Sequence, residues 1–295
     1  MFRVGILGSD NSHALMFSML CNLPQADGSY LYDDVRVTAI YGHDDDPAHT
    51  KEVAEKGGIE FIAKTPEDFY GKVDAVMVVY RHGSLHVPHI LPFVEKGYPV
   101  WIDKPVAESA ADIDKLREAV MKNNTLITGG STIKYNYEVL TLKNKAESKA
   151  LGDITGGSMN FPGDLSSEYG GLFFYGSHLC EMCMSVFGYD VKSVLASSTG
   201  AKNTMVIAKY GDKQVALHFT DAPKNIMTVH GAAGSASVEL DISIIYRLGF
   251  DKFVTMLRSK KMPLSFENLV KPVYMLNAIQ KSLGEGREVA LTEAL

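Results

Sequence analysis

A short glycine-containing turn near the start of the chain has residue types suited to binding an anion. The turn follows an apolar run at residues 4–7 and leads into residues at helical spacing, and its sequence is Gly8, Ser9, Asp10, Asn11, Ser12, His13. A strand that turns through glycine into a helix presents unpaired N–H groups and the positive end of the helix dipole. A Rossmann fold binds pyrophosphate at such a turn. We therefore predict that the cofactor phosphates are bound by Gly8, Ser9, Asn11, Ser12 and His13.

The turn departs from the G-x-G-x-x-G pattern at two positions. Asp10 and His13 stand where the second and third glycines would be. A carboxylate about 4 Å from a phosphate would cost about 4 kcal/mol at an effective dielectric constant near 20. We expect Asp10 to turn away from the phosphates and cap the helix. The alternative is that Asp10 caps the helix in a fold that no longer binds a dinucleotide.

The position that usually binds the cofactor ribose is also altered. An acidic residue normally ends the second strand, and here Gly42 follows the predicted strand at residues 35–41. One interpretation is that Asp44 binds the ribose hydroxyls, which favours NAD. The other is that the space beside Gly42, with His43 next to it, admits the 2′-phosphate of NADP. The predicted cofactor is thus NAD or NADP.

The elements that must position these residues form an α/β domain over residues 1–128. Short apolar runs at residues 4–7, 35–41, 74–80, 100–102 and 126–128 alternate with helical segments. This order predicts a Rossmann domain with a parallel sheet and crossover helices. One of the helices is predicted to begin after Ser109, which would be its cap.

The order of predicted strands and helices changes beyond residue 129. Six short strands are predicted at residues 154–161, 191–198, 205–210, 214–219, 226–230 and 236–240, several of them separated by tight turns. Strands joined by tight turns are typical of an antiparallel sheet. Helices predicted at residues 177–187 and 266–283 would cover one face. Residues 129–295 are thus predicted to form an α+β domain with a mostly antiparallel sheet.

Composition narrows the class of protein. The 295 residues carry a formal net charge of -6, which argues against nucleic-acid partners and anionic membranes. No apolar run approaches the roughly 20 residues that span a bilayer, and the first residues enter a strand pattern at once. Three cysteines do not make a disulfide framework. Cys180 and Cys183 lie in a predicted helix without a second pair, so we expect buried thiols, no metal and a cytoplasmic location.

Three segments together resemble the Gfo/Idh/MocA (glucose-fructose oxidoreductase/inositol dehydrogenase) family. The first runs from Gly83-Ser84-Leu85-His86 through a helix and strand to Asp103-Lys104-Pro105, in which Asp103 replaces the glutamate of a Glu-Lys-Pro run. The second, residues 170–181, is similar to the family's G-G-x-x-x-D-x-G-x-H-x-x-D stretch. The third comprises residues 229–235 and the terminal helix. The resemblance covers nearly the whole chain.

The resemblance implies an NAD(P)-dependent oxidoreductase that acts on a sugar, polyol or related hydroxy compound. Oxidising a secondary alcohol requires hydride transfer to nicotinamide and removal of the hydroxyl proton. The family places Lys104 and His178 at the reacting oxygen, with Lys104 also beside the cofactor. His86 falls at the family's cofactor-side turn. Lys134 stands about where the family often has an arginine near the substrate, and Tyr175 is the second predicted substrate contact.

One departure falls on the proton relay itself, because Phe174 matches the family's catalytic aspartate and cannot move a proton. A relay of Lys104 and His178 alone is one interpretation. A non-catalytic relative that binds a nucleotide or ligand as a sensor or scaffold is the alternative, favoured by Asp10, Gly42 and Phe174. A lyase or glycoside hydrolase that uses NAD transiently is a third. Relatives pair their second-domain sheets, so the resemblance also implies a homodimer or homotetramer.

Overall fold

The computed structural model describes residues 1–42 and 46–294. Its internal contacts divide the chain into two compact units. The first unit comprises Met1–Ala107, Ala111–Gly129 and Gly249–Phe266, and the second comprises Glu108–Ala110, Gly130–Leu248 and Glu267–Leu295. A parallel sheet in one unit and a mixed, mostly antiparallel sheet in the other confirm the predicted fold class. Within the described residues, no helix combines the length and apolar character needed to cross a bilayer.

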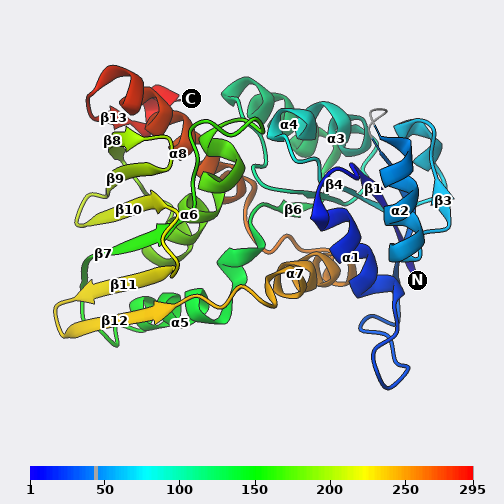
Figure 1. Ribbon diagram of the computed structural model, residues 1–295, viewed down its shortest axis with the longest axis horizontal. Helices are drawn as coiled ribbons and strands as arrows, with labels where there is room; N and C mark the ends of the chain where they lie inside the picture. Colours follow the sequence, from blue (N-terminus) through cyan, green and yellow to red (C-terminus); the bar gives the residue numbers. More distant parts are fainter. Residues whose placement is uncertain (43–45, 295) are drawn as a thin grey trace. The chain divides into compact units, whose positions relative to one another are not determined.

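The first unit is built on a six-stranded parallel sheet (Figure 1). Its strands lie in the order β3-β2-β1-β4-β5-β6, which is the Rossmann order. Their bounds are β1 (Phe2–Leu7), β2 (Val35–Tyr41), β3 (Phe61–Ile62), β4 (Ala75–Val78), β5 (Val100–Ile102) and β6 (Ile127–Gly129). The strand order reverses between β1 and β4, and a ligand crevice forms where neighbouring strands diverge at their carboxyl ends.

Helices connect these parallel strands, as a parallel sheet requires. They are α1 (Ser12–Asn22), α2 (Pro47–Gly57), α3 (His86–Glu95) and α4 (Ala110–Asn123). Helix α1 contacts β2, and α3 contacts β4 and β5. Each residue of β4 and of β5 is buried, which explains why these strands are continuous apolar runs in the sequence.

A helix from late in the chain completes the core of the first unit. Helix α7 (Ile245–Ser259) was not among the predicted elements. Its Phe250 stacks on Phe17 of α1, with ring centroids 5.5 Å apart. Its Phe253 meets the fully buried Trp101 of β5 edge-on at 6.2 Å. Most of α7 therefore belongs to the first unit, although more than a hundred residues of the second unit precede it in the sequence.

The second unit contains a seven-stranded sheet in the order β12-β11-β7-β10-β9-β8-β13. The strands are β7 (Ile154–Phe161), β8 (Ser193–Gly200), β9 (Asn203–Lys209), β10 (Gln214–Thr220), β11 (Ile226–Gly231), β12 (Gly234–Glu239) and β13 (Val289–Ala290). Neighbours pair antiparallel except β7 and β10, which run parallel. The parallel pair arises because the long helical segment after β7 separates it from β10 in the sequence.

The two faces of this sheet differ in what covers them. Helices α5 (Tyr137–Glu147) and α6 (Leu172–Phe187) lie against one face, and α8 (Phe266–Glu285) belongs to the same unit (Figure 1). One transverse row on the helix-covered face is fully buried or nearly so: Val206, Leu217, Met159 and Met227. Their strand neighbours point the other way. On that opposite face Leu195, Met205 and Ile226 are 40%, 43% and 44% exposed.

Candidate active site

The predicted phosphate turn is closely packed and capped. Gly8 has φ +101°, and a Cβ there would lie 2.8 Å from the backbone nitrogen of Tyr80, so only glycine fits. Asn11 is the helix cap, since its Oδ1 accepts a hydrogen bond from the His13 amide at 3.3 Å. The expected cap at Asp10 is therefore wrong. Asp10 accepts a hydrogen bond from the Arg81 amide at 3.1 Å instead, which holds its carboxylate to the loop after β4.

The space that was expected beside Gly42 is filled. A Cβ on Gly42 would lie 1.8 Å from Thr50 Oγ1 and 2.8 Å from Ser9 Oγ. These two hydroxyls are hydrogen-bonded at 2.8 Å, and Ser9 is buried. The position beside Gly42 is therefore closed to a side chain, and the interpretation in which this region admits the 2′-phosphate of NADP stays a prediction. Asp44, the other candidate for this region, lies outside the described residues, as does His43.

Lys104 lies in a buried turn at the carboxyl end of β5. Asp103 is fully buried and Lys104 is 3% exposed. The Lys104–Pro105 peptide bond is cis. The Asp103 carboxylate faces the phosphate turn, with its Oδ2 2.5 Å from His13 Nδ1 and 3.5 Å from Asn11 Nδ2. The predicted lysine and two predicted phosphate-turn residues are thus brought together through Asp103.

The charge on Asp103 is stabilised by its neighbours. Burial by itself would raise the pKa of this carboxyl, because a buried charge loses its hydration. Electrostatic attraction to His13, the His13 hydrogen bond and the nearby Lys104 together hold the pKa of Asp103 below its ordinary value. Asp103 is therefore a buried carboxylate at neutral pH.

His86 lies behind the Lys104 turn. Its Nδ1 is 2.6 Å from the carbonyl oxygen of Pro105, and its Nε2 is 2.8 Å from that of Tyr80. Burial lowers the pKa of His86, because the side chain is completely enclosed. The ring joins the chain after β4 to the chain after β5. Both of its nitrogens face carbonyl oxygens of the protein, and its predicted contact with the cofactor stays a prediction.

In the second unit, His178 is held by a residue that was not predicted from the sequence. Its Nδ1 lies 2.7 Å from the hydroxyl of Ser131, and both residues are buried. The Ser131 amide donates to Glu181 Oε1 at 2.7 Å. Glu181 lies one turn after His178 on α6, so the helix fixes the spacing of the two side chains. The H-x-x-E spacing was the visible signal for this arrangement.

Lys134 is the other partner of Glu181. Its Nζ lies 2.7 Å from Glu181 Oε2, and both side chains are 3% exposed. Burial would lower the pKa of Lys134, but the adjacent Glu181 charge outweighs it and raises the pKa above its ordinary value. The ammonium is therefore committed to a buried ion pair, and the structure places Lys134 as a support for the Ser131 turn.

Phe174 and Tyr175 line a cavity of about 560 Å³ that lies wholly within the second unit. Tyr169 packs on the Phe174 ring with centroids 5.0 Å apart. Tyr175 is 42% exposed, and its ring is 5.9 Å from the His178 ring. Phe161, at the end of β7, also lines the cavity and packs on His178 at 5.4 Å. The predicted substrate contact Tyr175 thus lines an aromatic cavity, and the predicted base His178 packs against two of its lining residues, Phe161 and Tyr175.

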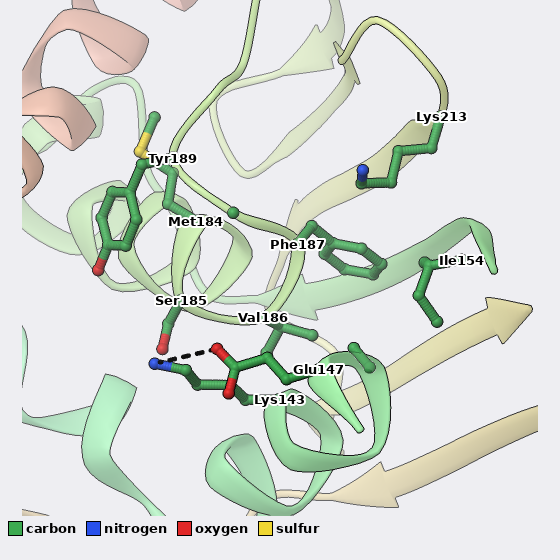
Figure 2. Close-up of a pocket in the computed structure, with 11 residues that line it drawn as sticks. Lys143, Glu147, Ile154, Met184, Ser185, Val186, Phe187, Tyr189 and Lys213 are labelled. Atoms are coloured by element: carbon green, nitrogen blue, oxygen red, sulfur yellow. Dashed lines mark ion pairs between the residues drawn. The ribbon is translucent and has the colours of Figure 1, made fainter. Parts of the chain in front are cut away.

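A second cavity in this unit is separate from these residues. It has a volume of about 280 Å³, and its lining includes Lys143, Glu147, Phe187 and Tyr189 (Figure 2). Lys143 and Glu147, one turn apart on α5, form an ion pair at 3.8 Å at its edge. None of the residues predicted from the sequence lines it, so we do not assign it to the candidate site.

The cysteines next to His178 are enclosed thiols. Burial raises the pKa of Cys183 to about 12 and that of Cys180 well above its ordinary value. Across residues 1–42 and 46–294, no group of three or more His, Cys, Asp or Glu side chains is arranged to hold a metal ion. The geometry of this region is therefore that of a packed helix.

Comparison with known proteins gives the sequence relationship. Residues 2–131 match the GFO_IDH_MocA family model, described as an oxidoreductase family with an NAD-binding Rossmann fold. Over 96 residues the chain is 32% identical to the inositol 2-dehydrogenase of Gluconacetobacter diazotrophicus. That alignment covers 32% of this chain and 28% of the relative's length.

Solved structures extend the similarity to the whole chain. A probable dehydrogenase from Thermotoga maritima matches with a TM-score of 0.85 at 19% identity, covering 99% of this chain and 100% of that one. The scyllo-inositol dehydrogenase of Lactobacillus casei, solved with NAD(H) and scyllo-inositol, matches with a TM-score of 0.83 at 13% identity, covering 99% of each chain. At these identities the structures establish a shared fold.

Proposed function

Since residues 2–131 match the model of the Gfo/Idh/MocA oxidoreductase family, we propose that the protein transfers hydride between NAD and a sugar, polyol or related hydroxy compound. One observation carries the proposal. Lys104 is a buried lysine at the carboxyl end of β5, and the residue before it is bonded to the phosphate turn. Ligands of such sheets bind outside the carboxyl ends of the strands, and Lys104 lies at that end of the sheet.

The phosphate turn fits a dinucleotide in spite of its two departures. Gly8 brings the turn against the backbone of Tyr80, and Asn11 and Ser12 begin α1. Asp10 is held by Arg81, so its carboxylate does not need to cap the helix. In this proposal Gly8, Ser9, Asn11 and Ser12 contact the cofactor phosphates, and Asp44 binds the ribose. With Thr50 filling the space beside Gly42, we favour NAD over NADP.

Lys104 supplies a positive charge to the reacting oxygen. A bound nicotinamide would accept or return the hydride. As the substrate hydroxyl loses its proton, the Lys104 ammonium hydrogen-bonds the oxygen and stabilises its developing negative charge. Asp103, directly before it, keeps a negative charge in the same buried turn and favours the charged form of the lysine.

His178 is the proposed general base. Its Nδ1 is hydrogen-bonded to Ser131 Oγ. When Nδ1 donates its hydrogen to that hydroxyl, the ring lone pair is on Nε2, which is the tautomer that removes a proton. Tyr175 is the proposed substrate contact, because it shares a cavity with Phe174 and packs near the His178 ring. We propose that Lys134 acts on the substrate only indirectly, through its ion pair with Glu181.

The test is removal of the Lys104 charge. Lys104→Met should lower kcat by at least about 10³-fold, while the dissociation constant for NADH, measured by nicotinamide fluorescence, changes by less than about fivefold. Lys115→Met is the matched control, since Lys115 is a surface lysine of α4 paired only with Asp112 in the described contacts. An unchanged kcat in Lys104→Met contradicts the proposed role.

The absence of an acid at Phe174 favours a second candidate, a relative that binds nucleotide or ligand without turnover. Phe174 packs on Tyr169 and lines the cavity with an apolar ring, which cannot donate a proton. Tight NADH binding with no turnover across a panel of sugars and polyols supports this candidate. No NADH binding at millimolar concentration contradicts both.

We also propose that the protein is a cytoplasmic homodimer or homotetramer. Its three cysteines are free thiols, which suits a reducing compartment. The sheet face bearing Leu195, Met205 and Ile226 presents exposed apolar side chains, the first two in the paired strands β8 and β9, which suits a subunit interface. Light scattering coupled to size exclusion should give twice or four times 32.3 kDa, and Met205→Glu should reduce that mass to the monomer's.

A further inference from the structure

Two sequence departures that look independent are bonded to one another. His13 stands where the phosphate turn usually has its third glycine, and Asp103 stands where the family has glutamate. In the structure the Nδ1 atom of His13 lies 2.5 Å from Asp103 Oδ2. His13 is 12% exposed and Asp103 is fully enclosed. The closest polar contact of the buried carboxylate is therefore the residue that replaced a glycine.

We propose that His13 and Asp103 form a paired substitution that positions Lys104, so that His13 is a positioning residue and not a phosphate ligand. This inference rests on the proposed function for the role of Lys104. The first turn of α1 is fastened through this pair to the residue immediately before the lysine. Movement of the phosphate turn and movement of the Lys104 backbone are thereby coupled.

Size and charge explain why the two residues occur together. A buried carboxylate needs hydrogen-bond partners, and His13 and Asn11 supply them to Oδ2 of Asp103. With glycine at position 13, Asp103 would lose its closest partner. With glutamate at position 103, an additional methylene would push the carboxylate into the imidazole. Positions 13 and 103 are therefore compatible either as histidine with aspartate or as glycine with glutamate.

The other side of the Lys104 turn is also fastened. His86 contacts the Pro105 carbonyl oxygen at 2.6 Å. The residues directly before and after Lys104 are thus each held by a histidine from another part of the first unit. The backbone on both sides of Lys104 is fixed in this way. This arrangement restricts the lysine to one position, and catalysis depends on positions held to within about 1 Å.

Kinetics of two single variants and their double test the pair. His13→Asn and Asp103→Asn should each lower kcat on the order of 10- to 100-fold, as misplacement of about 1 Å does, with the NADH dissociation constant within about threefold of the parent. The double variant should lose no more than the worse single one, because contacting residues are not additive. A parallel loss of NADH affinity in His13→Asn would show a phosphate ligand instead, and additive losses would show two independent roles.

The second test is recovery of kcat in a double variant. The Asp103→Glu variant should have a lower kcat than the parent protein. Combining His13→Gly with Asp103→Glu should raise kcat at least about tenfold above that of Asp103→Glu, since it restores the other compatible pair. Lack of recovery in a folded double variant overturns the proposal. Circular dichroism and thermal unfolding confirm the fold of each variant.

The third test is an NMR measurement that requires neither bound cofactor nor enzyme turnover. In protein labelled with ¹³C-lysine, the Lys104 Cε resonance is assigned with Lys104→Met. His13→Asn should shift this resonance and leave that of Lys115, on the α4 surface, unchanged. An unmoved Lys104 resonance contradicts the positioning role. A shifted resonance in a protein that shows no NADH binding would instead refute the proposed function while the pair stands.

Discussion

At the scale of single residues, the candidate site is notable for charges enclosed in the protein. Lys104, Asp103, Lys134 and Glu181 are all 3% exposed or less. Enclosing an ion costs several kcal/mol unless a partner and hydrogen bonds compensate. Glu181 satisfies both conditions, because its two oxygens bind the Ser131 amide and the Lys134 ammonium. These charges hold one conformation of the polypeptide rather than adding net stability.

The ion pair of Lys134 and Glu181 gives a stability prediction. Lys134→Met leaves a carboxylate buried without its ion partner, and should lower the free energy of unfolding by about 3–5 kcal/mol in urea melts followed by circular dichroism. Replacing both residues, with Lys134→Met and Glu181→Leu, should recover more than half of that loss. A double variant as unstable as the single would mean that Glu181 stabilises the unit mainly through Ser131.

Asp103 gives a pH prediction. Its pKa is lower in the folded protein than the ordinary value near 3.9 of an unfolded chain. The folded state therefore binds fewer protons at this group, so its contribution to stability is present above about pH 4 and is lost as the pH falls below that value. Between pH 6 and pH 3 the parent should lose more unfolding free energy than Asp103→Asn, measured by urea titration at each pH. Equal losses would contradict the lowered pKa.

Local sequence patterns single out individual residues but do not indicate their partners. The glycine turn, Lys104 and His178 are recognisable because each sits in a short local pattern. His13 and Asp103 are 90 residues apart, and nothing local in either pattern indicates that they touch. The same holds for Ser131, a common residue in a loop, whose role beside His178 depends on how two segments fold together.

At the scale of elements, helix α7 has the largest effect that the sequence did not predict. Phe250→Ala would remove the ring that stacks on Phe17 and leave a cavity. The expected loss is about 3–5 kcal/mol of unfolding free energy. Trp101, the protein's one tryptophan, lies in the same aromatic cluster, so its fluorescence should report the loss directly. Tyr246→Ala, at the start of α7, is the comparison variant, and an equal loss there would contradict the specific importance of the Phe250 stack.

Strands and helices with strong periodicity were predicted well, and their pairing was not. Strands β2 and β7 have the predicted bounds, because each is bordered by turn residues and has a consistent apolar pattern. The parallel pairing of β7 with β10 has no local signal, since it depends on the path of α6 between them. Helix α5 was also missed, because its apolar positions are few and only Val139 and Leu142 are buried.

At the scale of the whole molecule, the cysteines make a probe of global unfolding. Cys21, Cys180 and Cys183 are buried free thiols in different units. Burial raises the pKa of Cys183 to about 12, so almost no thiolate exists at pH 8 and the native thiols should be unreactive. A chromogenic disulfide reagent at pH 8 should label none within minutes and all three in denaturant. Rapid labelling of one thiol in the native protein would show local opening at that residue.

The discontinuous first unit has a consequence for synthesis of the protein. A ribosome must translate the entire β-sheet of the second unit, except β13, before it reaches Phe250 and Phe253. Until then the nascent α1 and β5 expose Phe17 and Trp101, which α7 covers in the finished protein. The domain that begins first is therefore among the last to be completed, and its apolar surface is open to chaperones during most of translation.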